Sequence, residues 1–267
     1  MRTVKSMSSF KFKKKYGQNF LTSETISDKI VDAINPTEED LILEIGPGGG
    51  ALTKKLKKYN CPLIAFEIDR EVEKYLSPLE DEKTRIVYED FLSADIISIL
   101  KAYHYQRLFI IGNLPYYITT PILDRIVEFA LEPEEIVIMV QKEVADRFMA
   151  KPKTREYGYM TVLLNYHYNI KIVTEVGRKN FRPVPAVDSA VLKLSKKAKV
   201  NLDYDRFKQL LKDSFQFKRK TINNNLKNYD LAKVQKTLRK HGYDLSSRAE
   251  ELDLETFIDL TNTTERK

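Results

Sequence analysis

Side chains suited to chemistry on a flat, amide-like group follow directly after a predicted strand. The apolar run Leu108–Ile111 is typical of a buried strand, and Gly112 and then Asn113-Leu114-Pro115-Tyr116-Tyr117 come after it. A hydrophobic core does not require a carboxamide, a proline and two aromatic rings at a strand end. We therefore interpret this segment as part of a binding or catalytic site.

The segment suits the activation of an amine on an aromatic base. Such an amine is a poor nucleophile because its lone pair is delocalised into the ring, and two acceptors on its N–H groups favour the pyramidal, reactive form. The side-chain oxygen of Asn113 and the carbonyl oxygen of Leu114 can supply these acceptors, while Pro115 restricts the backbone. Catalysis then rests on placement and on electrostatic stabilisation of a developing cation, without a strong base.

Aromatic side chains are expected to hold the base. Tyr116 can stack on it, a contact worth roughly 1–3 kcal/mol, and a base flipped out of a helix needs such stacking. Phe181, on a loop stiffened by Pro183 and Pro185, is the candidate for the opposite face, with core packing as the alternative. Tyr117 has no assigned role, and packing beneath the site is expected for it.

A second group of residues indicates a nucleoside-bearing cofactor. Gly46, Gly48 and Ala51 match a G-x-G-x-x-A pattern between a predicted strand and a predicted helix, where glycines let the backbone approach a ligand closely. Glu67 ends the next strand, 21 positions after Gly46, where a carboxylate can accept hydrogen bonds from ribose hydroxyls. By themselves these residues fit a dinucleotide and S-adenosylmethionine (SAM) equally well.

The end of the third strand and the Asn-Leu-Pro-Tyr segment favour SAM. Asp90 can accept from an adenine amino group, and Phe91 can pack on the adenine face. A nicotinamide-dependent dehydrogenase is expected to carry a Tyr–Lys or His–acid pair, whereas an amine-activating segment suits methyl transfer. The residues therefore predict SAM as the cofactor, with S-adenosyl-L-homocysteine as its product.

Strands and helices alternate along most of the chain, which predicts a parallel, doubly wound α/β sheet that positions these residues. The expected strands are 41–45, 64–68, 85–88, 107–112 and 136–140, and the expected helices are 24–34, 51–58, 69–79, 93–101 and 119–130. Thr119 or Thr120 is expected to cap the last of these helices, with Pro121 in its first turn.

The C-terminal part of the chain has a different pattern. Residues 166–176 and 189–194 alternate as strands, and after Lys196 only helical patterns remain, at 203–217, 230–240 and 254–261. We expect three regions: a basic, flexible tail at 1–15, a SAM-binding catalytic domain at 16–195, and a small all-helical RNA-binding domain at 196–267.

Positive charge gathers in two segments, which indicates a polyanionic partner. The net charge is +7; residues 1–15 hold six Lys or Arg and no acid, and residues 196–240 hold fourteen Lys or Arg and four Asp, so the remainder carries −9. Such segregation is typical of nucleic-acid binding. The candidate RNA-binding residues are Lys13, Lys14, Lys15, Lys218, Arg219 and Lys220.

Composition argues against several other classes. Cys61 is the only cysteine, which suits a reducing compartment, and His104, His167 and His241 lie far apart, so no metal site is expected. No run reaches the ~18 apolar residues of a membrane span, and the basic N-terminus lacks the apolar stretch of a secretory signal. We expect a cytoplasmic protein without a membrane partner.

Six motifs in order resemble one family over most of the chain, from about Lys14 to Phe257. The chain resembles the bacterial small-subunit (16S) rRNA adenine N6,N6-dimethyltransferases, the kasugamycin-sensitivity family. The motifs are Tyr16-Gly17-Gln18-Asn19-Phe20-Leu21, Glu44-Ile45-Gly46-Pro47-Gly48, Asn113-Leu114-Pro115-Tyr116-Tyr117, Gln141-Lys142-Glu143-Val144-Ala145, Phe181-Arg182-Pro183-Val184-Pro185-Ala186-Val187-Asp188-Ser189 and Lys218-Arg219-Lys220-Thr221-Ile222-Asn223-Asn224-Asn225-Leu226.

The resemblance implies a fold and a reaction. It implies a Rossmann-like, seven-stranded sheet whose last strand is antiparallel, catalysis by the unit from Asn113 to Tyr116, and Phe181 helping to hold the target adenine. It implies dimethylation of two adjacent adenosines near the 3′ end of small-subunit rRNA, within an assembling 30S particle. We also expect the protein to be a monomer. SAM contacts are implied at Asn19, Leu21, Gly46, Glu67, Asp90 and Asn113.

Three alternatives remain. Macrolide-resistance methyltransferases of large-subunit rRNA share the fold and chemistry but typically carry Asn-Ile-Pro-Tyr and Val-Asn-Ser, where this chain has Leu114 and Asp188. A non-catalytic RNA-binding assembly factor on the same fold is the second alternative, and a nicotinamide-dependent dehydrogenase is the third.

Overall fold

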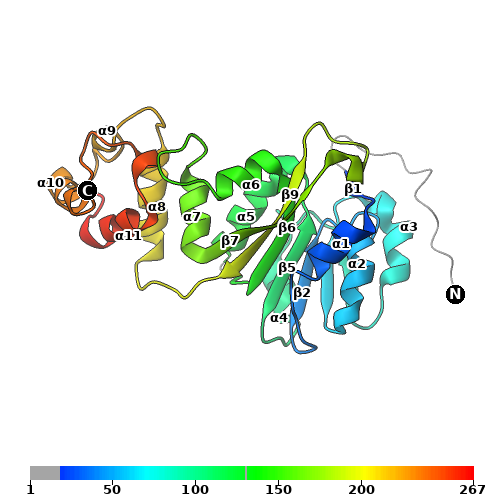
Figure 1. Cartoon of the computed structure of the whole chain (residues 1–267). Coiled ribbons are helices and arrows are strands. Elements are labelled where there is room, and N and C mark those ends of the chain that lie inside the picture. Colours follow the sequence, from blue (N-terminus) through cyan, green and yellow to red (C-terminus); the bar gives the residue numbers. More distant parts are fainter. Residues whose placement is uncertain (1–18, 130) are drawn as a thin grey trace. The chain divides into compact units, whose positions relative to one another are not determined.

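The computed structural model describes residues 19–129 and 131–267, which form two compact units (Figure 1). The first unit comprises the described residues up to Ala145 together with Lys171–Lys196, and the second comprises Asp146–Ile170 and Lys197–Lys267. The predicted tail at 1–15, with Lys13, Lys14 and Lys15, lies outside the described residues.

A seven-stranded sheet forms the centre of the first unit, in the order β4-β3-β2-β5-β6-β9-β7. Strands β4, β3, β2, β5 and β6 pair in parallel, and β9 pairs antiparallel with β6. The expected α/β sheet with an antiparallel last strand is thereby confirmed. The strands are β2 (Leu41–Ile45), β3 (Leu63–Phe66), β4 (Thr84–Val87), β5 (Leu108–Asn113), β6 (Glu135–Gln141), β7 (Tyr168–Val176) and β9 (Ser189–Lys196).

The inner strands are mostly apolar because helices cover both of their faces, and Glu44 on β2 is a buried exception. Every residue of β2 and of β3 is buried. Helices α1 (Glu24–Val31) and α2 (Ala51–Leu56) pack with alternate strand residues in one core cluster. The other helices of this unit are α3 (Glu73–Leu76), α4 (Ile96–Lys101), α5 (Thr119–Glu128) and the start of α6 (Lys142–Phe148).

Local signals placed some helix ends correctly and others not. Ser23 caps α1, since its side-chain oxygen accepts from the Ile26 N–H. The expected cap at Thr119 or Thr120 is wrong, because α5 begins at Thr119 and the Thr119 hydroxyl donates to the Pro115 carbonyl oxygen at 3.3 Å. The expected helix at 69–79 is split into three short helical pieces, and Pro78 lies in the first turn of the last one.

A two-stranded sheet that the sequence pattern did not predict joins distant segments. Strand β1 (Phe20–Leu21) pairs antiparallel with β8 (Phe181–Arg182). Strands of two residues are too short to show a period of two, so only the pairing defines them. The pairing sets Leu21 opposite Phe181 and connects the N-terminal segment to the loop before β9.

The second unit is helical and has its own core. Its helices are α7 (Tyr159–His167), α8 (Tyr204–Phe215), α9 (Ile222–Asn225), α10 (Leu231–Lys240) and α11 (Leu254–Thr263). The side chains of Asp203, Asp230 and Asp253 cap α8, α10 and α11 by accepting from backbone N–H groups. Phe207, Leu238 and Phe257 are fully buried in this unit.

Residues 146–170 belong with these helices, whereas the predicted boundary placed them in the catalytic domain. The aromatic ring of Tyr166, on α7, lies 6.0 Å from the ring of Tyr204 and 4.7 Å from that of Phe207, both on α8. These contacts join segments about forty residues apart in sequence. A domain boundary predicted from composition cannot take such contacts into account. Within the described ranges, no helix is both long and apolar enough to cross a membrane.

Candidate active site

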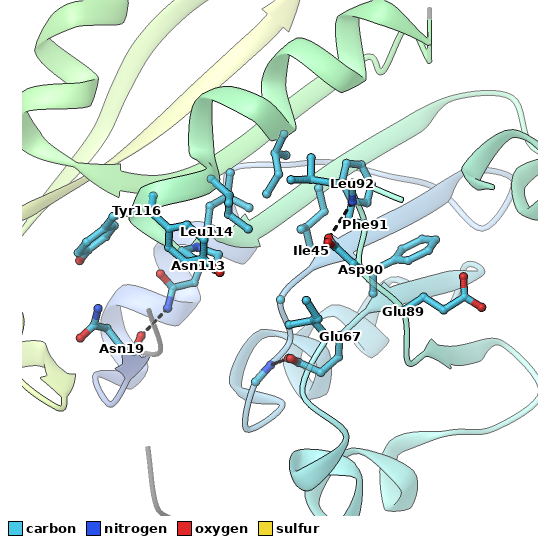
Figure 2. Close-up of a pocket in the computed structure, with 18 of the residues that line it drawn as sticks. Asn19, Ile45, Glu67, Glu89, Asp90, Phe91, Leu92, Asn113, Leu114 and Tyr116 are labelled. Carbon is cyan, nitrogen blue, oxygen red and sulfur yellow. Dashed lines mark hydrogen bonds between the residues drawn. The ribbon is translucent and has the colours of Figure 1, made fainter. Parts of the chain in front are cut away.

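The predicted cofactor and base-binding residues meet at one edge of the sheet. Because β2, β3, β4 and β5 are parallel, their carboxyl ends lie together, and the order of connection reverses between β2 and β5, where ligands bind in such sheets. A pocket lies there (Figure 2), lined by the strand ends and by Asn19 and Phe20.

The glycine loop after β2 has a conformation that favours glycine. Gly46 and Gly48 have φ angles of +72° and +53°, which side-chain-bearing residues rarely adopt. A Cβ atom on Gly48 would lie 2.3 Å from the ring of Phe20, so the missing side chain allows this ring to lie close over the loop. Phe20 was not among the predicted site residues, because nothing in the sequence around it indicates that its ring contacts the distant glycine loop.

Glu67 connects the glycine loop to the end of β3. Its two carboxylate oxygens accept from the Gly48 N–H at 2.9 Å and from the Asp69 N–H at 2.8 Å. Burial raises the pKa of Glu67, and these N–H groups partly offset that rise by stabilising the charged form. Each oxygen keeps a further lone pair, so the carboxylate can still accept from ribose hydroxyls.

A second buried acid lies close to Glu67 and was not predicted to matter. Glu44 on β2 is 1% exposed, and its Oε2 atom has no hydrogen-bond partner among the described residues. Burial, together with a smaller effect of the neighbouring Glu67 charge, raises the pKa of Glu44 to about 8. Near neutral pH this side chain is therefore mainly an uncharged carboxylic acid.

The end of β4 forms the wall opposite Asn113 (Figure 2). One carboxylate oxygen of Asp90 accepts from the Leu92 N–H at 2.9 Å, which fixes this side chain at the pocket. Phe91 is 4% exposed, and its ring packs edge-on against Phe66 with centroids 5.6 Å apart. Phe91 thus lines the pocket from a buried position, while Ile68 is 41% exposed there and offers an aliphatic surface that was not predicted.

Hydrogen bonds fix the orientation of the Asn113 amide at the end of β5. Its side-chain nitrogen donates to the carbonyl oxygen of Asn19 at 2.9 Å (Figure 2). Only the nitrogen can donate, so the amide oxygen is the atom left to accept a hydrogen bond from a ligand. Gly112 brings the strand close, because a Cβ atom there would lie 2.5 Å from the Ile45 carbonyl oxygen.

The rest of the Asn-Leu-Pro-Tyr segment is anchored on both sides. The Pro115 carbonyl accepts from the Ile118 N–H at 3.1 Å, which leads the chain into α5. The hydroxyl of Tyr116 lies 2.7 Å from the hydroxyl of Ser189, the first residue of β9. Burial raises the pKa of Tyr116, so its hydroxyl stays neutral near physiological pH. The segment is a preorganised turn.

Most of the predicted catalytic and cofactor-binding residues line this one pocket, and two of them do not. Leu21 and Phe181 lie in the hydrophobic core of the first unit, and Phe181 is 1% exposed, because pairing of β1 with β8 turns both side chains inward. Tyr117, expected beneath the site, is instead 58% exposed at the pocket. The predicted residues in the pocket are Asn19, Gly46, Gly48, Glu67, Asp90, Phe91, Asn113, Leu114, Pro115 and Tyr116.

Fold and site together define a SAM-dependent methyltransferase. The sheet has this class's single antiparallel strand, and the glycine loop, Glu67 and Asn113 lie at the carboxyl ends of its central strands. A model of the ribosomal RNA adenine dimethylase family matches residues 9–266. The chain therefore belongs to this family, as its motifs predicted.

Three relatives that match over most of their length carry one name. The chain is 40% identical to the ribosomal RNA small subunit methyltransferase A of Ligilactobacillus salivarius, over 94% of this chain and 89% of the relative. It is 37% identical to the protein of that name from Enterococcus faecalis, over 96% of this chain and 92% of the relative. The relative from Aster yellows witches'-broom phytoplasma is 39% identical, over 93% and 94%.

Solved structures share the fold. A dimethyladenosine transferase from Plasmodium falciparum superposes with a TM-score of 0.73 at 23% identity, over 90% of this chain and 95% of that one. The 23S rRNA methyltransferase ErmE superposes with a TM-score of 0.69 at 25% identity, over 92% and 99%. These likenesses support the assigned fold over nearly the full length of the chain.

Proposed function

We propose that this protein transfers methyl groups from SAM to the N6 amino groups of two adjacent adenosines near the 3′ end of small-subunit (16S) rRNA. The observation that carries the proposal is the hydrogen bond from Asn113 to Asn19, which leaves the Asn113 amide oxygen as an acceptor at the pocket. An acceptor held in this way suits an amine that must keep its lone pair free for attack.

The residues at the strand ends fit SAM. Gly46 and Gly48 hold the loop in a conformation that brings its backbone to the pocket. Glu67 retains lone pairs for ribose hydroxyls, and Asp90 is fixed where it can accept from an adenine amine. Asn19, at the pocket wall, is a further candidate contact. When bound, SAM supplies an electrophilic methyl group on a sulfonium centre.

The chain's own residues then prepare the target amine. The Asn113 side-chain oxygen and the Leu114 carbonyl accept from its two N–H bonds, Pro115 keeps these acceptors in place, and Tyr116 stacks on the base. The lone pair of N6 forms the new N–C bond as the bond from sulfur to carbon breaks. The charged amine then loses a proton to water, so the site needs no strong base.

Two predicted contacts call for a different conformation. Phe181 is buried in the core, so to stack on the opposite face of the adenine it would have to leave its place beside β1. We propose that Phe181 takes this role when β1 and β8 rearrange. Leu21, which pairs with Phe181, would then also be able to reach SAM. Tyr116 is the aromatic side chain of the segment that already lies at the pocket.

The second unit supplies charge for an RNA partner. Lys218, Arg219 and Lys220 are exposed there, and we propose that they contact RNA phosphates, as Lys13, Lys14 and Lys15 would from the N-terminal segment. We further propose that the substrate is rRNA within a pre-30S particle, and that the protein acts as a cytoplasmic monomer.

A methylation assay separates the two candidate substrates. With labelled SAM, undermethylated 30S and 50S subunits are offered separately, and dimethyladenosine near the 3′ end of 16S rRNA is the expected product. The likeness to ErmE makes large-subunit rRNA the second candidate, so product confined to 23S rRNA would overturn the choice. SAM binding without any methylation would favour a non-catalytic assembly factor.

A further inference from the structure

The turn between α8 and α9 (Figure 1) carries an aromatic side chain that the fold does not use. Phe217 is 54% exposed, whereas Phe215, two residues earlier, packs inward with its ring centroid 5.7 Å from that of Phe257. The two side chains thus have opposite roles, although both are phenylalanine in one short segment. Single exposed apolar residues are common on protein surfaces, so a functional role for Phe217 has to be argued from the residues around it.

Buried polar contacts hold this turn in place. The Lys220 N–H donates to the Phe217 carbonyl oxygen at 2.9 Å, which closes a four-residue turn. From inside, the side-chain nitrogen of Asn225, which is 8% exposed, donates to the Ser214 carbonyl at 2.7 Å and lies 3.3 Å from that of Phe217. The ring of Phe217 is therefore presented from an anchored turn.

Positive charge borders the ring. Lys218, Arg219 and Lys220 follow Phe217 directly and are exposed. None of the three forms an ion pair with an acidic side chain in residues 19–129 and 131–267. Cations that are not neutralised within the protein suit backbone phosphates, and an exposed aromatic face next to them in the chain suits a base.

We propose that Phe217 stacks on an unpaired base of the bound RNA, while the adjoining cations hold the phosphates on either side of it. The inference rests on the proposed function, in which rRNA is the partner. Stacking accepts any base, so this contact adds affinity for a single-stranded nucleotide without reading its identity. A protein partner would instead use the ring as an apolar contact only.

The test measures binding of the full-length protein to undermethylated 30S subunits at several salt concentrations. Phe217→Ala is expected to weaken binding roughly 5- to 150-fold, the range that 1–3 kcal/mol of base stacking corresponds to, with the salt dependence unchanged. Phe217→Tyr keeps a ring and is expected to bind like the wild type. Phe217→Leu keeps apolar area but no ring, and it is expected to bind as weakly as the alanine variant.

Matched variants separate this inference from the proposed function. Lys218→Gln is expected to flatten the salt dependence, because one fewer counterion is released. Phe129→Ala, an exposed phenylalanine of the first unit, is expected to change nothing. If Phe217→Ala, or Phe217→Leu alone, binds 30S subunits with wild-type affinity, base stacking by Phe217 is wrong although the protein still binds RNA. If binding of the wild type and of every variant is independent of salt, and no methylation is detected, the proposed function itself is wrong.

Discussion

The side-chain nitrogen of Asn113 donates to the main-chain oxygen of Asn19 at 2.9 Å, across 94 positions of sequence. This contact joins the end of β5 to the segment that leads into β1, and it decides which atom of the amide faces a ligand. Because a carbonyl oxygen only accepts, the amide cannot turn over without losing the bond. The acceptor role proposed for Asn113 thus depends on a residue from a different motif.

Replacing Asn113 tests this role directly. Asn113→Ala removes the acceptor and is expected to lower kcat by roughly 100- to 1,000-fold, as loss of one preorganised electrostatic contact does. Asn113→Asp keeps an acceptor but has no donor for Asn19, so its carboxylate is repelled from that carbonyl and activity is expected to fall as well. Single-turnover methylation gives the rates, and thermal unfolding checks that both variants fold; activity within threefold of wild type in Asn113→Ala would contradict the acceptor role.

The hydroxyl contact between Tyr116 and Ser189 is expected to position the ring. Tyr116→Phe and Ser189→Ala each remove the 2.7 Å hydrogen bond. The methylation activity of the double variant is therefore expected to be no lower than that of either single variant. Tyr116→Ala removes the stacking face and is expected to raise the KM for the RNA substrate much more than the Kd for SAM. Isothermal titration and steady-state methylation measure the two, and an equal loss in both would point to general damage to the pocket.

Gly48 is expected to tolerate no side chain. In Gly48→Ala the methyl group meets the Phe20 ring, and the φ of +53° adds roughly 1–2 kcal/mol of strain. We expect lower stability and weaker SAM binding. Gly158→Ala is the matched control, since a Cβ atom there has no neighbour within 4 Å, and it is expected to unfold at nearly the wild-type temperature. Wild-type SAM affinity in Gly48→Ala would show that the loop does not approach the ligand closely.

Glu44 is expected to make stability depend on pH. Its pKa is raised from 4.5 to about 8, so the folded protein holds a proton there that the unfolded chain has released. Stability from this group is therefore complete below about pH 4.5 and is lost as the pH rises from there through about 8, a change on the order of 5 kcal/mol. The raised pKa of Glu67 acts in the same direction.

Urea unfolding at pH 5.5 and pH 8 measures this dependence. Glu44→Gln has the shape of the protonated acid without its titration, so the difference in unfolding free energy between the two pH values is expected to shrink. Glu82→Gln, a change at an exposed acid, is expected to leave the difference as it is in the wild type. An undiminished difference in Glu44→Gln would show that Glu44 in the folded protein is already charged at pH 5.5, which would contradict its raised pKa.

Local sequence patterns predicted the sheet and most of the pocket. Short, mostly apolar runs such as 41–45 and 108–111 form strands because they are buried on both faces and bounded by glycine or polar residues. The parallel topology then brings Gly46, Glu67 and Asn113 to one edge, which follows from the alternation of strands and helices alone. For these three residues, the order of strands and helices along the chain was enough to predict their place at the pocket.

Only the tertiary structure decided how the side chains of the site are held. Contacts between distant segments decide the orientation of Asn113, the burial of Phe181 against β1, the burial of the acid Glu44 and the place of residues 146–170. Such contacts have no period and no fixed spacing in sequence. By itself the sequence determined which groups reach the pocket edge and which family the chain belongs to. The fold decided which atoms of those groups remain to act, because hydrogen bonding and burial are set by neighbours that the chain order does not reveal.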